Sequence, residues 1–540
     1  MKTTQRPLEF EKAWGIFVRL SLTLAFCLPA GCGRQPALNT HGIAETVASP
    51  QSGGSAEVEE HIRRFCGDCH AVPRPESFPR DRWAEEVRIG YQQYVRSGRD
   101  DLTPPPIAEV IAYYRERAPE KLEFHLPQDS QQKLPISFRQ EDVDWEGRPR
   151  VAPAVSGLAY HRLPDSDKPW LIISDMATGT ITALDMKSRE SRVLARLQFP
   201  CRIQPCDLER TGRVGFVVAE LGSFFAMDHH DGKVVWLRPE EKGPQFRVIP
   251  LAENLGRVAD VRVADFDGDG DLDVLAAEFG HYRTGGILLL ENESTKEGAL
   301  RFVPHRLDQR PGTIHVPVTD LNTDGRPDFV ALISNEWEVV EWFVSLGNNR
   351  FLCRPIWRAP DLTFGSSGLE LVDLDGDGDI DILFTNGDSF DNLYANPSHG
   401  VQWLENRNAD SPEGFHYHRL LDWPGAYRAV TGDLDGDGDL DIVASAWLPK
   451  SVRPQELQQM EMPSLIILEQ EPGTTFSCHI VDKIWPQFPV ILLADLDRDG
   501  DLDIVAGRHS GLDAGRSDVT APLRVYWNEM KSVAEPARHP

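Results

Sequence analysis

An acidic motif occurs five times in the second half of the chain, and its residue types and spacing suit a divalent cation. It reads Asp-x-Asp-x-Asp-Gly-x-x-Asp, with Asn in place of the second Asp in one copy. Carboxylates this close together repel one another, so a hard cation is their natural counter-ion, and Ca²⁺ accepts such a flexible sphere of oxygen ligands. With a backbone carbonyl expected at position 7, the predicted calcium ligands are Asp265, Asp267, Asp269, Asp271 and Asp273; Asp320, Asn322, Asp324, Arg326 and Asp328; Asp373, Asp375, Asp377, Asp379 and Asp381; Asp433, Asp435, Asp437, Asp439 and Asp441; and Asp495, Asp497, Asp499, Asp501 and Asp503.

The residues around these acidic loops exclude an EF-hand. Position 6 is glycine in every copy, which allows a sharp turn. An EF-hand needs a glutamate at position 12, where the first copy has Ala276 and the third has Phe384. The flanks, such as residues 261–264 and 274–277, are largely apolar and rich in β-branched residues, so each acidic loop is expected to join two strands. The alternative interpretation is an acidic, solvated turn without a metal.

The copies recur at intervals of 53 to 62 residues, which indicates a repeat architecture with one supersecondary unit per copy. Over about residues 150–530 the sequence resembles the FG-GAP (VCBS-type) repeats of integrin α-subunit-like seven-bladed β-propellers. The resemblance implies a calcium loop between the first two strands of a blade. Residues 286–292 and 401–406 fit third strands of such blades, and residues 351–356 and 476–480 fit fourth strands.

Two earlier units without a complete acidic motif bring the expected number of blades to seven. One contains residues 207–215, where Gly215 replaces the last carboxylate, and the earliest contains residues 170–174. Neither is expected to bind calcium well. A closed ring usually borrows a strand from the other end of the module. Residues 134–138 could supply it beside residues 523–527, or they could be a plain linker.

Cys66-Gly-Asp-Cys69-His70 is the second group of residues with clear chemistry. A Cys-x-x-Cys-His run predicts covalent attachment of one c-type haem to Cys66 and Cys69, with His70 as the proximal iron ligand. A zinc ribbon would need a second cysteine pair at similar spacing, and a disulfide oxidoreductase would be expected within a βαβ pattern. The sequence has neither feature.

Two helices are expected around this motif, at residues 58–65 and 102–114, with Thr103 as the N-cap of the second and Pro104 at its first position. They resemble the first and last helices of small cytochrome c domains. The resemblance implies a small all-α haem domain before the propeller.

The sixth iron ligand is left open by the sequence. No methionine lies between His70 and Met176, so His125, Tyr91, Tyr94 or a propeller residue could supply it. An iron without a sixth protein ligand would suit small-ligand binding or peroxide chemistry.

The N-terminal residues predict export. Basic residues precede a short apolar run at residues 20–28, which is typical of a signal peptide. Residues 28–32 resemble a bacterial lipobox, with Pro29 where leucine is usual, and imply lipidation of Cys32 and a membrane anchor in the periplasm or at the cell surface. The expected layout is a signal peptide (1–32), a flexible tether (33–55), the haem domain (56–125), a linker (126–150), the propeller (151–530) and a tail (531–540).

Composition agrees with an exported, acidic protein. The formal net charge of −28 over 540 residues makes nucleic acid an unfavourable partner. Cys201 and Cys206 are close enough in sequence for a disulfide in an oxidising compartment. Cys353 and Cys478, at matching places in outer strands, are expected to be buried apolar residues.

The expected fold is mainly β, a seven-bladed β-propeller with calcium loops preceded by a small all-α cytochrome c-like domain. The expected function is electron transfer, with the propeller docking a protein redox partner or a glycan. The alternatives are an oxidoreductase whose propeller binds substrate and reduces the haem, and a calcium-dependent adhesion or scaffold protein. No catalytic residue is predicted. The expected binding face, opposite the acidic loops, includes residues 278–283, 335–337, 386–391, 447 and 508–509.

Overall fold

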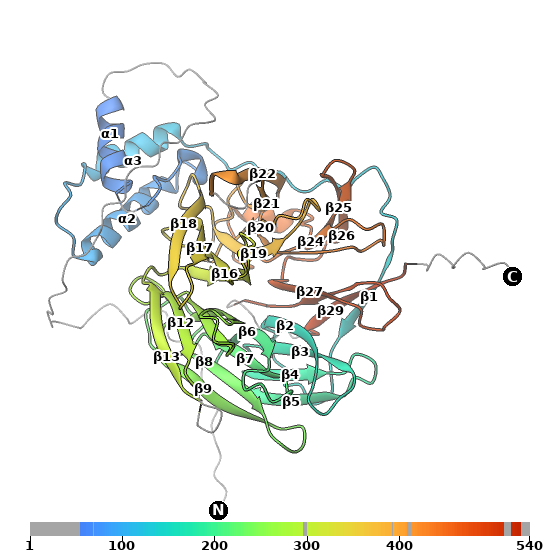
Figure 1. The fold of residues 1–540 in the computed structure, drawn as a ribbon. Coiled ribbons are helices and arrows are strands. Elements are labelled where there is room, and N and C mark those ends of the chain that lie inside the picture. The colour runs from blue at the N-terminus through green and yellow to red at the C-terminus, as the bar shows by residue number, and fades with distance from the viewer. Residues whose placement is uncertain are drawn as a thin grey trace, which may run out of the picture. The chain divides into compact units, whose positions relative to one another are not determined.

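The structure is a computed structural model that describes residues 55–68, 70–294, 300–390, 392–407, 412–511 and 520–530. In these ranges three α-helices precede β-strands that form seven sheets (Figure 1). No helix within them is both long and apolar enough to cross a lipid bilayer. The helices are α1 (Ser55–Cys66), α2 (Trp83–Ser97) and α3 (Ile107–Arg117), and the 3-10 helices are η1 (Pro75–Ser77), η2 (Pro412–Gly414) and η3 (Gln455–Gln459).

The seven sheets are the blades of a β-propeller. Blade 1 contains β2 (Val155–Arg162), β3 (Pro169–Asp175), β4 (Thr180–Leu184) and β5 (Ser191–Arg196). Blade 2 contains β6 (Pro200–Cys206), β7 (Gly215–Glu220), β8 (Gly232–Pro239) and β9 (Phe246–Leu255). Blade 3 contains β10 (Val258–Ala264), β11 (Asp273–Glu278), β12 (Gly286–Asn292) and β13 (Phe302–Asp308). Blade 4 contains β14 (Thr313–His315), β15 (Val318–Thr319), β16 (Asp328–Ile333), β17 (Val339–Ser345) and β18 (Phe351–Arg358).

Blades 5 to 7 follow the same antiparallel order. Blade 5 contains β19 (Ser366–Val372), β20 (Asp381–Asn386), β21 (Gly400–Asn406) and β22 (Phe415–Asp422). Blade 6 contains β23 (Ala426–Gly432), β24 (Asp441–Ala446), β25 (Leu465–Glu471) and β26 (Thr475–Asp482). Blade 7 contains β27 (Val490–Ala494), β28 (Asp503–Gly507), β29 (Leu523–Asn528) and β1 (Phe138–Val143).

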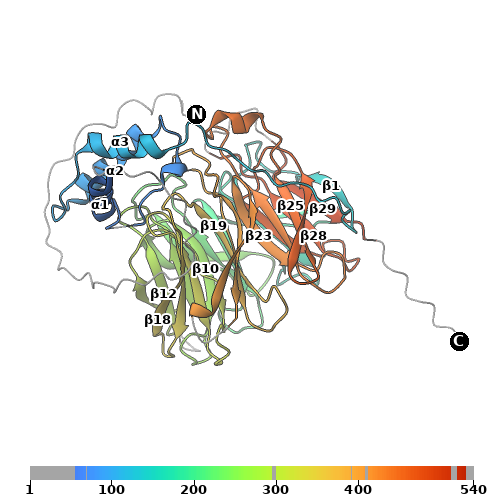
Figure 2. The same ribbon diagram turned by 90° about the horizontal axis from the view of Figure 1, so that it is seen from above.

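The first strands of the blades form the inner ring of the propeller. Each contacts the first strand of the next blade, and β27 contacts β2, so the ring is closed. Figure 2 shows two of these neighbours, β19 and β23, side by side. In blade 4 the inner strand is split into β14 and β15 around Pro317, which has no N–H to donate.

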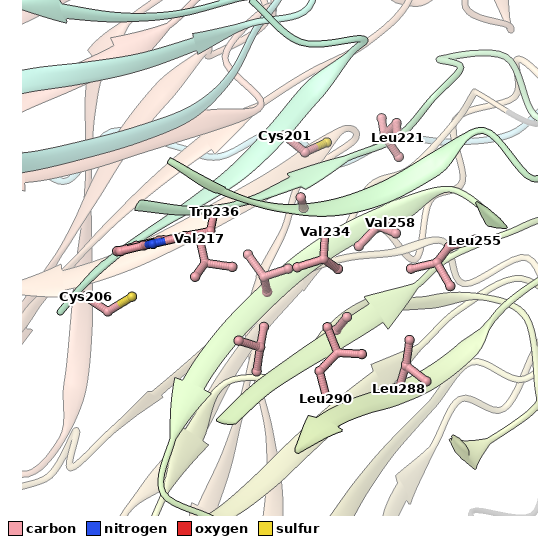
Figure 3. Packing of buried hydrophobic residues seen from close by; sticks show 14 of the residues in the cluster. Cys201, Cys206, Val217, Leu221, Val234, Trp236, Leu255, Val258, Leu288 and Leu290 are labelled. Carbon is pink, nitrogen blue, oxygen red and sulfur yellow. The ribbon is translucent and has the colours of Figure 1, made fainter. Parts of the chain in front are cut away.

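Apolar clusters fill the spaces between adjacent blades. Figure 3 shows the cluster between blades 2 and 3, where Val217 and Trp236 from blade 2 pack near Leu288 and Leu290 from blade 3. Because each second strand is covered on both sides, its residues are almost all buried, as in β11 and β20. This explains the near-continuous apolar composition of these strands, without the alternation of a half-exposed sheet.

A strand from the N-terminal side of the propeller completes blade 7, but it lies further along the chain than predicted. β1 pairs antiparallel with β29, from Phe138 opposite Asn528 to Val143 opposite Leu523. The predicted pairing with residues 523–527 is confirmed, whereas the choice of residues 134–138 is wrong apart from Phe138. Ile136 is instead a buried member of the apolar cluster between blades 6 and 7.

The predicted start of the helix at residues 102–114 is also wrong. α3 begins at Ile107, with Pro106 as its N-cap, instead of beginning at Pro104 after Thr103. Each proline disfavours the helical conformation of the residue before it, so three consecutive prolines at 104–106 delay the helix until the last of them.

Two cysteine predictions are corrected as well. Cys201 and Cys206 are free and buried near opposite ends of β6, and Figure 3 shows them well apart, so they do not form a disulfide. Cys353 is exposed on outer strand β18, where its thiol donates to Glu341 Oε2 at 3.3 Å, and is therefore not a buried apolar residue. Cys478 is half-buried against the cluster between blades 5 and 6.

Candidate metal and haem sites

All five acidic loops connect the first strand of a blade to the second. The loop after β10 ends where β11 begins at Asp273, and the other copies end at the first residues of β16, β20, β24 and β28. The strands on both sides hold the loop ends at a fixed separation. The aspartates of each motif are therefore held close together in one loop.

In four of these loops, three carboxylates lie close enough to share one ion. Their oxygen atoms are within 4.8 Å of one another in each group found among the described residues. Oxygen atoms at that separation match the hard-ligand sphere of Ca²⁺. The groups are Asp265, Asp267 and Asp269; Asp373, Asp375 and Asp381; Asp433, Asp435 and Asp437; and Asp495, Asp497 and Asp503.

Two orphaned oxygen atoms show that the loops do not satisfy their own carboxylates. Asp373 Oδ1 and Asp501 Oδ1 are buried without a hydrogen-bond partner. Buried carboxylate oxygens without partners are costly, and a bound cation would supply the missing interaction. The residues present therefore fit a calcium ion.

The last aspartate of the motif has a role that the sequence does not reveal. Asp273 accepts from the backbone N–H of Phe266 at 3.0 Å and of Asn292 at 2.8 Å, so its two oxygens join the acidic loop to the end of β12. Asp381, Asp441 and Asp503 make the equivalent pair of bonds. This carboxylate braces the blade whether or not it also touches an ion.

Burial makes these bracing carboxylates weak acids. It raises the pKa of Asp273, Asp381 and Asp441 to about 7 and that of Asp503 to about 6, against the opposing effect of the backbone N–H groups. A nearby cation would favour the ionised form.

The melting temperature of the calcium-free protein is expected to fall as the pH rises from about 5 to about 8. Near pH 5 the bracing carboxyls are protonated in the folded chain but mostly ionised in the unfolded chain, whose aspartates have pKa values of about 3.9. The folded state then binds more protons, so its stability declines as the pH rises through the folded-state pKa. Thermal melts in calcium-stripped buffers measure this slope. A triple Asp→Asn variant at 273, 381 and 441 should flatten it, and an unchanged slope would contradict the assignment.

The copy with Asn322 is assembled differently. It is absent from the carboxylate groups found in the described residues, and the Arg326 guanidinium pairs with Asp324 inside the loop. Asp320 accepts from the N–H groups of Asp324 and Gly325 at 3.0 and 2.7 Å. A guanidinium within the loop competes with a metal ion, so this loop suits calcium less than the other four.

In the incomplete motif at residues 207–215, backbone N–H groups of the loop occupy the carboxylate of the first aspartate. Asp207 accepts from the N–H of Thr211 at 3.0 Å and of Gly212 at 2.6 Å. Arg210 reaches the next blade, where it pairs with Asp271. This loop therefore adds positive charge beside a neighbouring acidic loop and collects no carboxylates of its own.

Histidine–glutamate pairs connect the third and fourth strands of three blades that have complete motifs. His305 pairs with Glu291 at 2.5 Å, and His418 and His479 pair with Glu405 and Glu469 at 2.6 and 2.7 Å. Burial raises the pKa of Asp267 most, and the negative charges of the nearby aspartates and of Glu291 raise it further. Sequence reasoning missed these pairs, although a glutamate before the last residue of β12 and β21 was a visible signal.

The haem motif begins at the last residue of α1. Cys66 ends this helix and is half-buried, while Cys69 lies outside the described residues. His70 donates from Nδ1 to the Ala71 carbonyl at 2.8 Å, which leaves Nε2 with the lone pair that a metal would need. Burial raises the pKa of the Cys66 thiol to about 11, whereas a redox-active Cys-x-x-Cys thiol needs a lowered value.

The core between the helices is aromatic and contains one orphaned hydroxyl. Trp83 stacks on Tyr114 with ring centroids 3.9 Å apart, and Phe65 contacts Tyr91 at 5.3 Å and Tyr94 at 4.9 Å. The Tyr114 hydroxyl is buried without a partner. An apolar, aromatic core with an unsatisfied polar atom next to the motif fits a haem group.

The residues named for the sixth iron position are only partly available. The hydroxyls of Tyr91 and Tyr94 donate to the carbonyls of Pro105 at 2.5 Å and Leu102 at 3.1 Å. His125 is exposed. The tyrosines therefore already have hydrogen-bond partners, and within the described residues no hydrogen bond or ring contact joins the three candidates to His70.

Loops from several blades meet on the face opposite the acidic loops. Trp447 lies 4.0 Å from Phe390 and 4.6 Å from His509 by ring centroid, and Phe224 is 5.1 Å from His509. Trp447 Nε1 also donates to the His509 carbonyl at 3.0 Å. These four aromatic residues, here called the loop aromatic cluster, come from blades 2, 5, 6 and 7. Of the residues predicted for this face, Trp337 and residues 278–283 are not part of this cluster.

The helical residues contact loops on the same side of the propeller. Phe78 and Arg82 lie 5.6 and 5.2 Å from the Tyr394 ring, in the connection between β20 and β21. Asp361, between β18 and β19, accepts from the Arg74 N–H at 2.9 Å and from the Ser77 hydroxyl. Part of the expected binding face is thus covered by the chain itself.

A family comparison identifies one of the repeats. Residues 320–384 match the model of an FG-GAP-like repeat. No curated protein matches the sequence. Similar solved structures include a luciferin-regenerating enzyme, with 12% identity, a TM-score of 0.36 and coverage of 64% of this chain and 100% of that chain. Another is BBS1N in complex with ARL6DN, with 11% identity, a TM-score of 0.39 and coverage of 74% and 98%. The predicted FG-GAP-like repeat and seven-bladed β-propeller are confirmed.

Proposed function

We propose that this chain is an exported haem c protein that transfers electrons and carries a calcium-binding β-propeller as a docking platform for a partner protein or a glycan. The observation that carries the proposal is the Cys-x-x-Cys-His motif at the end of α1, with His70 Nε2 free to bind a metal. Lipidation at Cys32 would anchor the chain to a membrane; that residue and the signal peptide lie outside the described residues.

Each residue of the motif has a distinct task in this proposal. The thiols of Cys66 and Cys69 would hold the haem covalently, and His70 would ligate its iron. A haem held in this way supplies a one-electron carrier. The Ala71 carbonyl fixes the orientation of the His70 ring and increases the electron density on Nε2. The aromatic residues of α2 and α3 would exclude water from the group.

Calcium in the acidic loops would act on structure instead of chemistry. An ion in each of the four three-carboxylate groups would neutralise charges that otherwise repel, at the junction of first and second strands. Blades held in this way present the loops of the opposite face as a rigid surface, which suits recognition of a partner.

The protein expressed in a bacterial periplasm with a haem-attachment system is expected to give a c-type reduced-minus-oxidised absorption spectrum. A low-spin spectrum would show that a protein residue fills the sixth iron position, and a high-spin spectrum would show an open position for small ligands. Absence of covalent haem would overturn the electron-transfer proposal and leave a calcium-dependent binding propeller.

Cys69→Ala is the matched variant for that experiment. It should abolish the two-bond attachment, while Cys353→Ala, at an exposed thiol on β18, should leave the haem spectrum unchanged. An unaltered spectrum in Cys69→Ala would refute the assignment of the motif.

The loop aromatic cluster favours a second candidate, an oxidoreductase whose propeller face binds substrate and reduces the haem. Four aromatic side chains from separate blades resemble the lining of a small-molecule site more than a solvated loop surface. Saturable, substrate-dependent reduction of the haem would support this candidate. Calcium-dependent binding of a macromolecule without turnover would exclude it and support docking.

A further inference from the structure

Six charged or titratable side chains meet on the inner ring of the propeller. We call them the central charged cluster: Arg202 on β6, Asp260 and Arg262 on β10, His315 on β14, Glu370 on β19 and Arg428 on β23. They interact across blade boundaries, since Asp260 lies 3.5 Å from both Arg202 and His315, and Arg428 lies 4.0 Å from Glu370. Neither the acidic loops nor the haem motif uses any of them.

A repeated irregularity of the inner strands brings these residues to one level. The pairing register of the first and second strands shifts immediately before Asp260, His315 and Arg428, and Arg202 lies within the corresponding shift of blade 2. Each is the third residue of its strand. A bulge redirects the side chain beside it, so the same device recurs in four blades.

The two carboxylates of the cluster accept most of their hydrogen bonds from groups other than Arg202 and Arg428. Asp260 Oδ2 accepts from Arg262 Nε and Nη2 at 3.1 Å and from the Val316 N–H at 3.1 Å. Glu370 Oε1 accepts from the N–H and the hydroxyl of Thr431 at 3.1 and 2.9 Å. Arg262 is therefore well paired. Arg428 Nη1 donates to the Leu369 carbonyl at 3.0 Å, but its ion contact with Glu370 is long. Arg202 has the 3.5 Å contact with Asp260, and its Nε is buried without a hydrogen bond.

Charge in the cluster does not balance. Burial lowers the pKa of His315 to about 4, so this ring is neutral near pH 7, and three arginines face two carboxylates. Burial, followed by the charges of Arg262 and Arg428, lowers the pKa of Arg202 to about 9. Arg202 and Arg428 nevertheless keep 29% and 12% of their side-chain surface accessible, which requires room for a water-sized group beside them.

We propose that the central charged cluster is a binding site for a small oxyanion, held by the guanidinium groups of Arg202 and Arg428 on the inner ring. Planar guanidinium groups match pairs of oxygen atoms on a sulfate, phosphate or carboxylate, and they bind such groups through two hydrogen bonds at once. One bound anion would compensate the excess positive charge. Contacts to an anion would also link blades 2 and 6, which are not adjacent in the ring.

Titration calorimetry of the full chain with sodium sulfate, at constant ionic strength set by sodium chloride, tests this site. We expect saturable binding of one sulfate per chain. Arg428→Gln should weaken it by about tenfold or more, because a charge-assisted hydrogen bond is lost. Arg247→Gln, at an exposed arginine of outer strand β9, is the matched control and should leave the affinity unchanged. Repeating the titration with phosphate and acetate distinguishes tetrahedral from carboxylate ligands.

For Glu370→Gln we expect the sulfate affinity to increase. It removes a negative charge beside Arg428 with little change in volume, so sulfate should bind several-fold more tightly. This variant keeps the test decisive if Arg428→Gln fails to fold. Absence of saturable sulfate binding to the unmodified chain would overturn the proposal, as would equal affinities in the Glu370→Gln and Arg247→Gln variants.

Discussion

Removing calcium is expected to lower the melting temperature of the propeller by about 14 °C. An ion that binds only the folded state stabilises it by about 2.7 kcal/mol when its free concentration is a hundredfold above Kd. Four occupied loops would then contribute roughly 11 kcal/mol. A unit of this size has an unfolding entropy of roughly 0.8 kcal/mol/K, which converts that contribution into a shift of this order.

Differential scanning calorimetry with and without a chelator measures the effect, with magnesium as the control cation. Magnesium needs a smaller, more regular octahedral sphere, so it should restore less stability than calcium. A melting temperature that chelation leaves unchanged would show that the acidic loops are metal-free turns.

The loop with Asn322 offers a gain-of-site control for the same experiment. Replacing Asn322 by Asp and Arg326 by Asp would recreate the motif of the other four loops and remove the guanidinium that pairs with Asp324. We expect the number of tightly bound calcium ions to rise from four to five. Asp435→Asn, in a loop that gathers three carboxylates, should lower the number by one. Unchanged stoichiometry in both variants would contradict the assignment of ions to these loops.

The acidic loops were predictable because their information is local. The spacing of the aspartates and the glycine at position 6 fix a turn between two strands, and this is where the structure places them. The second role of the last aspartate was not predictable in this way. Asp273 bonds to Asn292, at the end of β12, and that pairing depends on the register of two strands rather than on the motif.

The central charged cluster was even less predictable from local sequence. Asp260 and Arg262 appear in the sequence as polar interruptions of an apolar strand, and nothing local indicates their partners. Arg202 and His315 meet Asp260 only because the blades close into a ring. The helix at residues 107–117 illustrates the opposite error, since a favourable capping residue, Thr103, was given more weight than three consecutive prolines.

A chain that starts at residue 144 is expected to aggregate or to melt without a cooperative transition, whereas a chain that starts at residue 134 should melt as one unit. The two differ by β1, which covers the edge of β29 along six residue pairs and buries Val143. Without β1 the edge of blade 7 exposes unpaired N–H and C=O groups, a known template for association between chains. Thermal melts followed by circular dichroism, with light scattering as the readout of association, compare the two chains.

A point variant in the full chain separates edge protection from simple loss of residues. Asp142 accepts from Arg508 Nη2 at 2.6 Å and from Arg524 Nε at 2.7 Å, and the Arg508 side chain is only 4% exposed. Asp142→Ala leaves that buried guanidinium with fewer partners and should cost about 1–3 kcal/mol of unfolding free energy. Arg139→Ala, at an exposed position of the same strand, should cost much less. If the chains starting at 134 and 144 melt alike, β1 does not hold the ring closed, and the apolar contacts between blades 7 and 1 must be sufficient to seal it.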